Sequence, residues 1–351
     1  MPRMSFDAAD YYSRQIVLKV LGKQGQDRLK SARATVIGVG GIGSASALYL
    51  ALAGVGNLVL VDQDTVELNN LHRQILFTIQ DLRLPKAEVA ARRLMGANPN
   101  VKASSIPDNL REENVERIIR GSDVVVDGLD NMRTRYILNS ACSRLSIPYV
   151  FGGAIAMEGN VSVFHPPETP CLECILPAID DRNLPGCDTR GVLGATAGIV
   201  GSVQAMETVK LLAGVESVLK GKLLVCDFRR MEFDKVGIFR RKDCNVCGDR
   251  IGPMVERAQR LTWLCGRETV NVNPIEPANL DFERTLKNLR RRFDVLVRSA
   301  VVIVLRHGGL EVSLFRNGRM LIKGVGTEDK ALRIYRELSS FFAYVRSSSK
   351  D

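Results

Sequence analysis

The architecture of this chain follows from a glycine-rich stretch, GVGGIG at residues 38–43. An apolar run at residues 34–38 leads into it, and a helical pattern at residues 44–53 follows it. Residues 58–61 then have the composition of a second buried strand, which ends at Asp62. A strand, a glycine turn, a helix and a strand in this order predict an α/β fold, with a Rossmann-like, doubly wound, mostly parallel sheet between two layers of helices.

The composition is that of an ordinary globular protein with room for two domains: 351 residues, 45% hydrophobic and 25% charged. The N-terminus lacks a secretory pattern, and no apolar run approaches the roughly 20 residues that a membrane span needs. We therefore expect a cytoplasmic protein without membrane contact. Of the net charge of +10, +8 lies in residues 250–351, where 19 Lys and Arg stand against 11 Asp and Glu. A basic tail suits an acidic protein partner or a nucleic acid.

The glycine turn predicts a nucleotide site. Its glycines let backbone N–H groups approach a phosphate closely, and the N-terminus of the following helix adds about half a positive charge. Asp62, 19 residues after Gly43 at a strand end, is placed to accept hydrogen bonds from a ribose. These features alone fit a dinucleotide-binding dehydrogenase equally well. The candidate glycines are Gly38, Gly40, Gly41 and Gly43.

Charged residues further along favour cleavage of ATP. Splitting ATP between its α and β phosphates develops negative charge that cations and a metal-binding carboxylate neutralise, whereas a dehydrogenase leaves its pyrophosphate intact. Arg73, Lys86 and Arg14 are the candidate cations, and Asp130 is the candidate magnesium ligand.

The eight cysteines, without a secretory signal, favour metal or thiol chemistry over disulfides. Four of them form two Cys-x-x-Cys pairs 70 positions apart, Cys171 with Cys174 and Cys244 with Cys247. Two such pairs complete a tetrahedral four-thiolate zinc site.

A further cysteine, Cys187, is a candidate nucleophile. It stands in LPGCDTRGVLG at residues 184–194, where Arg190 favours a thiolate and Asp188 opposes it. A thiolate there would attack an acyl adenylate to give a thioester, or take part in acyl persulfide or disulfide chemistry. The alternative is a buried structural cysteine.

Together these motifs resemble the MoeB/ThiF family and the adenylation domains of ubiquitin-activating enzymes, over about residues 5–250. The resemblance rests on DxDxVxxNNLxRQ at residues 62–74, on Lys86, and on DxxDN at residues 127–131. It implies that residues matching Asn70 and Arg73 contact the phosphates along with Lys86, and that Asp130 carries magnesium. The full nucleotide-binding set that it implies is Gly38, Gly40, Gly41, Gly43, Asp62, Asp64, Asn70, Arg73, Gln74, Lys86, Asp130 and Asn131.

The resemblance also implies an activity. ATP and Mg²⁺ would serve to adenylate the C-terminal glycine of a ubiquitin-like β-grasp protein ending in Gly-Gly, followed by transfer through Cys187. The paired cysteines would hold structural zinc, and Arg14 would reach across a homodimer into the partner's site. Sulfur delivery to molybdopterin, thiamin or tRNA pathways and ubiquitin-like conjugation to proteins are both open as fates of the carrier.

The domains that we expect are N-terminal helices at 1–30, an ATP-binding Rossmann-like adenylation domain at 31–165, the zinc, crossover-loop and carrier-binding half of that domain at 166–249, and a small basic α+β domain at 250–351. The last is similar to a C-terminal extension of some prokaryotic family members. It lacks the Cys- and Arg-rich loop of a rhodanese, so we expect the chain not to carry its own persulfide donor. Because it is an extra domain after an activating core, we expect it to recruit the carrier, a conjugating enzyme or a sulfurtransferase.

Two alternatives stay open. The first is a relative that activates a carboxylate on tRNA or on a small molecule, which the basic tail would suit. The second is an NAD-binding dehydrogenase or an inactive scaffold. A dehydrogenase would need a proton-transferring His or Lys in a second domain, and a scaffold would normally lose some of Arg73, Lys86 and Asp130, which are all present.

Overall fold

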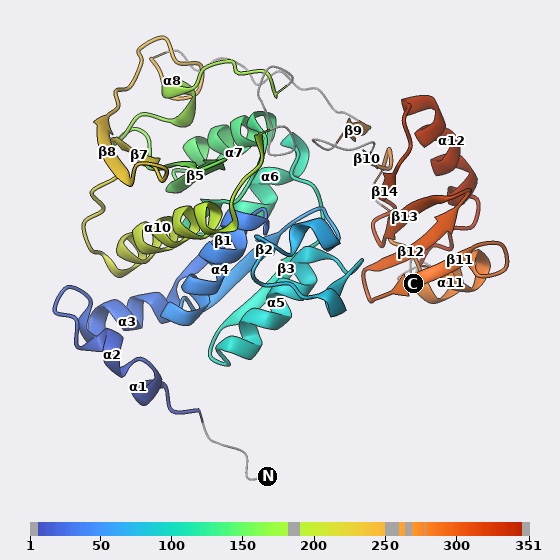
Figure 1. The fold of residues 1–351 in the computed structure, drawn as a ribbon, viewed down its shortest axis with the longest axis horizontal. Coiled ribbons are helices and arrows are strands. Elements are labelled where there is room, and N and C mark those ends of the chain that lie inside the picture. The colour runs from blue at the N-terminus through green and yellow to red at the C-terminus, as the bar shows by residue number, and fades with distance from the viewer. Residues whose placement is uncertain (1–5, 182–189, 250–259, 264–268, 277, 346–351) are drawn as a thin grey trace, which may run out of the picture. The chain divides into compact units, whose positions relative to one another are not determined.

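The computed structural model describes residues 6–181, 190–249, 260–263, 269–276 and 278–345. The chain folds into two compact units (Figure 1). Unit 1 comprises residues 1–82 and 86–256, and unit 2 comprises residues 83–85 and 257–351. Among the described residues, no helix is long and apolar enough to cross a membrane.

Unit 1 is built around one sheet, whose strands are β1 (Arg33–Ile37), β2 (Asn57–Val61), β3 (Lys102–Ile106), β4 (Val124–Asp127), β5 (Tyr149–Ile155), β6 (Glu158–Phe164), β7 (Lys222–Asp227) and β8 (Glu232–Gly237). Their order is β3-β2-β1-β4-β5-β6-β7-β8. From β3 to β5 all neighbours are parallel, and from β5 to β8 they are antiparallel. The predicted Rossmann-like sheet is confirmed, and its strand order reverses between β1 and β4, where such folds bind ligands.

Helices cover both faces of this sheet. They are α1 (Ala8–Tyr11), α2 (Ser13–Ile16), α3 (Gly22–Ser31), α4 (Gly41–Ala53), α5 (Lys86–Ala97), α6 (Glu112–Ile119), α7 (Met132–Arg144), α8 (Leu172–Ile175) and α10 (Gly194–Ala213), with single 3-10 turns at Leu68–Asn70 and Ile79–Asp81. On one face α4 packs against α5 and α10. On the other face α6 packs against α7 (Figure 1).

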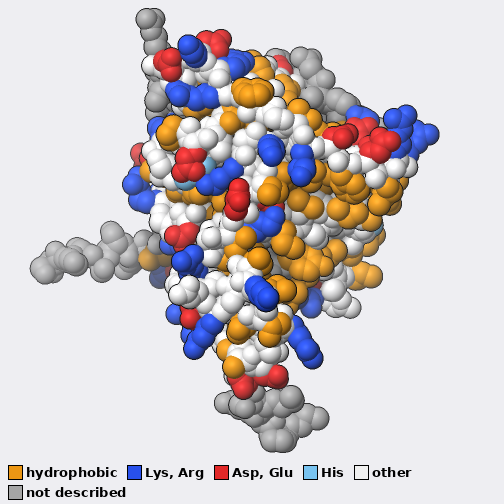
Figure 2. Space-filling model, turned by 90° about the vertical axis from the view of Figure 1, so that its left-hand side faces the viewer, with side chains coloured by type: hydrophobic (Ala, Val, Ile, Leu, Met, Phe, Trp, Pro, Cys, Tyr) orange, Lys and Arg blue, Asp and Glu red, His pale blue; other side chains and the backbone are white. Residues whose placement is uncertain are grey.

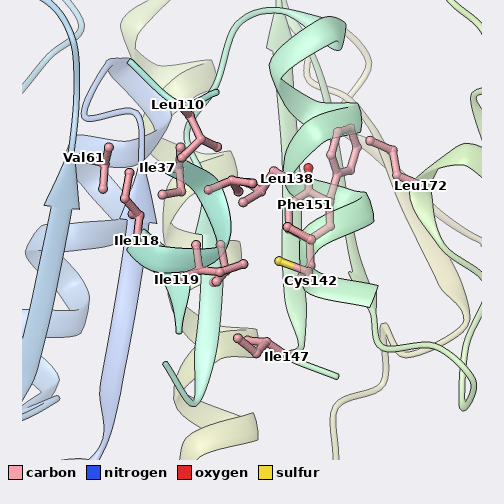
Figure 3. Packing of buried hydrophobic residues seen from close by; sticks show 14 of the residues in the cluster. Ile37, Val61, Leu110, Ile118, Ile119, Leu138, Cys142, Ile147, Phe151 and Leu172 are labelled. Atoms are coloured by element: carbon pink, nitrogen blue, oxygen red, sulfur yellow. The ribbon is translucent and has the colours of Figure 1, made fainter. Parts of the chain in front are cut away.

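A hydrophobic core fills the space between the sheet and the α6–α7 layer (Figure 3). Ile37 and Phe151 contribute from β1 and β5, while Ile119 and Leu138 contribute from α6 and α7. All four are at most 4% exposed. This packing fixes the strands whose carboxyl ends carry the polar residues discussed below, because burial of apolar surface is the main favourable term in folding.

Unit 2 is a small α+β fold, as the sequence predicts. Its strands are β9 (Leu261–Trp263), β10 (Thr269–Val272), β11 (Asp294–Arg298), β12 (Val302–His307), β13 (Leu310–Phe315) and β14 (Met320–Lys323), and its helices are α11 (Phe282–Leu289) and α12 (Glu328–Ser339). The antiparallel sheet has the order β11-β12-β13-β14-β10-β9. Leu286 of α11 and Ile334 of α12 belong to the same buried cluster as Ile303 and Ile322 of the sheet.

Candidate active site

The turns after β1 and β4 touch each other, and this contact explains several glycines. A Cβ built on Gly43 would lie 1.9 Å from the carbonyl oxygen of Gly38, and one on Gly128 would lie 2.2 Å from the same atom. A Cβ built on Gly40 would instead have Gln74 Nε2 as its nearest neighbour, at 3.8 Å. The space beside Gly40 is therefore open, at the N-terminus of α4, where backbone N–H groups attract a phosphate.

Asp62 follows β2 and is attached to the glycine turn. The backbone N–H of Val39 donates to its Oδ2 at 2.7 Å, and the N–H of Asp64 donates to its Oδ1 at 2.8 Å. Burial raises the pKa of Asp62 to about 6, and Asp64 adds to this shift while Lys86 and the two N–H groups oppose it. The carboxylate thus lies beside the glycine turn.

Lys86 is a buried cation within this cluster. It is 5% exposed at the start of α5, and its Nζ lies 3.0 Å from Asp64 Oδ2. Burial disfavours the charged form of Lys86, but the carboxylates of Asp64 and Asp62 outweigh it and raise the pKa of the lysine. Asp130 contributes in the same direction. The structure therefore brings Asp62, Asp64, Lys86 and Asp130 into one electrostatic cluster.

The turn after β2 supplies two buried amides and an arginine. Asn70 and Gln74 are 4% and 3% exposed, and among the described residues Asn70 Oδ1 and Gln74 Oε1 have no hydrogen-bond partner. Unsatisfied buried acceptors cost about 1–3 kcal/mol each, so they suit donors from a ligand. Arg73 donates to the carbonyl oxygen of Asn69 at 2.8 Å. Its Cγ would lie 3.5 Å from a Cβ on Gly41, which places its stem beside the glycine turn.

The Asp130 loop connects β4 to α7. Asp130 is exposed, and Asn131 donates to its Oδ1 at 3.2 Å. Asn131 also caps α7 by accepting the N–H of Thr134 at 2.9 Å. An exposed carboxylate at this edge can bind a hard cation such as Mg²⁺, which prefers carboxylates, water and phosphate oxygens.

Arg135 is a functional candidate that the sequence analysis missed. Its Nε lies 3.0 Å from Asp127 Oδ2, and its Nη2 donates to the carbonyl oxygens of Leu129 at 2.6 Å and Gly152 at 2.7 Å. The hydroxyl of Tyr149 donates to the same Asp127 oxygen at 2.6 Å. These bonds hold the Asp130 loop from below. One feature of the sequence could have indicated it: Arg135 lies three positions after Met132, on the same buried face of α7.

The segment around Cys187 lies outside the described residues, but both of its flanks are attached to this edge of the sheet. The Asp181 carboxylate accepts the N–H groups of Met132 at 2.6 Å and Arg133 at 3.0 Å, at the N-terminus of α7. After the segment, the N–H of Leu193 donates to the carbonyl oxygen of Ala156 at 3.2 Å. Asp181 is a second residue that sequence reasoning did not single out.

Arg14 is not brought to this cluster within one chain. It is exposed on α2, and no hydrogen bond or ion pair among the described residues connects it to the glycine turn, Lys86 or Asp130. The one-chain structure thus leaves its predicted action across a dimer untested.

The four paired cysteines form one compact, buried cluster. All four Sγ atoms of Cys171, Cys174, Cys244 and Cys247 lie within 4.8 Å of one another, with separations of 3.9, 3.6 and 3.4 Å for three of the pairs. A tetrahedral zinc ion with Zn–S bonds of about 2.3 Å requires S–S distances of about 3.8 Å. The backbone N–H of Arg241 also donates to Cys174 Sγ at 3.4 Å. The donor set therefore fits zinc.

Known proteins resemble this chain over most of unit 1. Residues 12–247 match the model of the ThiF family. The SAMP-activating enzyme E1 of Haloferax volcanii is 43% identical over 249 residues, which is 70% of this chain and 92% of that protein. A sulfur carrier protein adenylyltransferase of Thermus thermophilus is 41% identical over 70% of this chain and 93% of its own length. The ThiS adenylyltransferase of Escherichia coli is 40% identical over 68% and 94%.

Solved structures show the same fold. The E. coli protein MccB aligns with a TM-score of 0.63 at 22% identity, over 73% of this chain and 77% of its own. The family match ends at residue 247, before the helices and sheet of unit 2, and it contains the glycine turn, the Lys86 cluster and all four paired cysteines. This chain therefore belongs to the ThiF family.

Proposed function

We propose that this chain adenylates the C-terminal glycine of a small ubiquitin-like β-grasp carrier protein and releases pyrophosphate. The observation that carries the proposal is the buried Lys86–Asp64 pair beside Asp62 and the open glycine turn. The names of the relatives, which include sulfur carrier adenylyltransferases and an activating enzyme E1, support the choice of a carrier protein as substrate.

The chain's residues suit an in-line displacement at the α-phosphate. A carboxylate oxygen of the carrier forms a bond to this phosphorus, and the bond from phosphorus to the departing pyrophosphate breaks. The glycine turn holds phosphate oxygens, Asp62 accepts from the ribose, and Lys86 with Arg73 offsets the charge that develops on pyrophosphate. Mg²⁺ held by Asp130 would supply further charge neutralisation between the phosphates. No general base is required.

The antiparallel end of the sheet offers a surface for the carrier. Every residue of β8 is exposed, and Phe233 and Val236 are 48% and 49% exposed. Met231 and Phe239, on either side of β8, are 65% and 83% exposed. Clustered exposed apolar side chains mark an interaction surface, and β8 is the last strand of the sheet among the described residues, so its outer edge can add a strand.

A second apolar surface supports a homodimer. Val17, Leu18 and Val20 after α2 are 74%, 52% and 72% exposed, and Met206 of α10 is 57% exposed. Figure 2 shows hydrophobic side chains gathered over a broad part of one face. Covering this segment with a second copy would bring the neighbouring Arg14 close to another chain, so we propose that Arg14 completes the partner's site.

The subsequent steps are also part of the proposal. Cys187 would attack the acyl carbon of the adenylate and form a thioester, while the bond from the acyl carbon to AMP breaks and AMP is released. Structural zinc in the four-cysteine cluster would stabilise this half of unit 1. Unit 2, outside the family match, would recruit the carrier, a conjugating enzyme or a sulfurtransferase.

The test is incubation of the purified chain with Mg²⁺, ATP and β-grasp proteins ending in Gly-Gly. Intact masses are read under non-reducing conditions, with Cys187→Ala in parallel. We expect a carrier–AMP adduct with both proteins and a covalent enzyme–carrier species with the wild type alone. An adduct without the covalent species would remove the thiol step. No adduct with any carrier would overturn the proposal and favour a tRNA or small-molecule carboxylate.

A further inference from the structure

A polar cavity lies beside the proposed site, at the same edge of the sheet. Its volume is about 650 Å³, and it is open to solvent. The turn between β5 and β6 lines one side, and the turn after β7 lines the other. The lining residues are Ala156, Met157, Glu158, Arg190, Asp227, Arg229 and Arg230.

The charged residues that line this cavity are three arginines and two carboxylates, which leave a net charge of +1. Arg190 Nη2 lies 3.4 Å from Glu158 Oε1, so this exposed pair largely offsets itself. Oδ1 of Asp227 accepts the backbone N–H groups of Arg229 at 2.9 Å and Arg230 at 3.1 Å, and the carboxylate keeps its negative charge beside the two arginines. Among the described residues, no ion pair engages the guanidinium groups of Arg229 and Arg230. Both side chains are exposed.

Sheet topology sets the distance from this cavity to the Asp130 loop. Glu158 opens β6 opposite Ile155, the last residue of the parallel strand β5, and Asp227 ends β7 opposite Glu158. The cavity therefore lies at the carboxyl edge, two to three strands from β4 and the Asp130 loop. With strands about 4.8 Å apart, this separation is about 10–14 Å, which an extended peptide covers in about three to four residues.

We propose that this cavity receives an acidic side chain of the carrier's C-terminal tail, about three to four residues before the terminal glycine, and that Arg229 and Arg230 bind it. The inference rests on the proposed adenylation of a carrier and names the tail chemistry that it selects. Arginine forks bind carboxylates with well-defined geometry, so the contact would favour acidic tails over neutral or basic ones.

The test uses N-terminally fluorescein-labelled hexapeptides that end in Gly-Gly and carry Glu, Gln or Lys at the fourth position from the C-terminus. Their dissociation constants for the full chain are measured by fluorescence anisotropy at low and high salt. The variant is Arg229→Glu/Arg230→Glu. The matched control is Arg117→Glu/Arg120→Glu, which makes the same charge change on exposed Arg117 of α6 and on exposed Arg120, the residue that caps the C-terminus of α6 ahead of β4.

We expect the Glu peptide to bind about tenfold more tightly than the Lys peptide to the wild type and the control, and this order to reverse with Arg229→Glu/Arg230→Glu. Equal affinity of the wild type for the three peptides would overturn the inference, whether or not a carrier is adenylated. With a carrier that is adenylated, the variant should raise the KM for the carrier and leave the KM for ATP unchanged. A change in the KM for ATP without a change in the KM for the carrier would also contradict the inference.

Discussion

At the scale of single residues, we expect Lys86 to matter for both activity and stability, because it interacts with two carboxylates and is almost fully buried. Lys86→Met should lower the rate of ATP–pyrophosphate exchange by a factor of about 10²–10³, as loss of one transition-state contact does elsewhere. It should also lower the free energy of unfolding by about 1–3 kcal/mol, since Asp62 and Asp64 lose their cation.

Lys102→Met is the control for this prediction, because Lys102 is an exposed lysine at the start of β3. It should leave both quantities unchanged. Exchange kinetics and urea unfolding provide the measurements. If Lys86→Met exchanged pyrophosphate at the wild-type rate, the lysine would be a structural cation only.

Asp62 predicts a dependence of stability on pH. Burial raises its pKa to about 6, above the ordinary value of 3.8, so between these values the folded protein holds a proton that the unfolded chain releases. The contribution of Asp62 to stability is therefore complete below about pH 4 and is lost as the pH rises through about 6. Asp62→Asn removes this titration, although it also weakens a backbone hydrogen bond at every pH.

The measurement is urea unfolding of the wild type and Asp62→Asn between pH 4 and 7, with the exposed Asp27→Asn as the control. The difference between wild type and Asp62→Asn should change steeply between about pH 4 and 6. The difference between wild type and Asp27→Asn should stay flat. A flat Asp62 difference would mean that the carboxylate is not held in a buried environment.

The sequence indicates Asp62, Lys86 and the paired cysteines as candidate site residues because each stands at a characteristic spacing within a motif. They did not predict Arg135 or Asp181. The role of each depends on a partner that the chain brings near only after folding: Arg135 reaches Gly152 on β5, and Asp181 reaches α7 from 48 or more positions away. A charged residue in a single sequence does not reveal such a partner.

At the scale of elements, the contact between α4 and α10 depends on one glycine. A Cβ on Gly201 would lie 2.5 Å from the carbonyl oxygen of Ile42 and 2.8 Å from the Cβ of Ala45. Gly198, one turn earlier on α10, has nothing within 4 Å. Gly201→Ala should therefore lower the free energy of unfolding by about 1–3 kcal/mol through overpacking.

Gly198→Ala is the matched variant, with the same chemical change in the same helix. It should raise stability by about 0.5–1 kcal/mol, because alanine favours a helix over glycine. Urea unfolding of the two variants measures both effects. Equal effects of the two substitutions would show that helix propensity, and not the contact with α4, decides the outcome.

Most elements of the parallel half follow the sequence pattern, since β1, β2 and β4 are short apolar runs. Differences concern their ends and the antiparallel half. The helix expected from Ser44 begins at Gly41, inside the glycine stretch. No strand was assigned to β8, because all its residues are exposed and it has no hydrophobic pattern. These residues form a strand because they pair with β7, and such pairing depends on the tertiary structure.

At the scale of the molecule, the four-cysteine cluster joins α8 to the loop after β8 across 70 positions of the chain. Metal analysis should find one zinc per chain in the wild type and in Cys226→Ser, and none in Cys171→Ser/Cys244→Ser. Chelation should lower the melting temperature by more than about 5 °C, because zinc binding to the folded state alone stabilises it. A metal-free protein with an unchanged melting temperature would contradict the assignment.

For unit 2 the hydrophobic pattern predicts the fold but not the function. Its strands and helices follow the hydrophobic pattern, yet it lies outside the residues that match the family. The proposed homodimer is likewise beyond one sequence, because a single chain records which of its surfaces are apolar but not what covers them.

The contact between the turns after β1 and β4 has a consequence for mutational tolerance. At Gly38, Gly43 and Gly128 a side chain would collide with backbone, so substitutions there abolish the fold and the activity together. At Gly40 there is room for a methyl group in the empty protein, and only a bound phosphate would compete for it. Within one six-residue stretch, we therefore expect Gly38 and Gly43 to be needed for folding and Gly40 to be needed for ligand binding, and Gly40→Ala is the substitution that would separate the two effects.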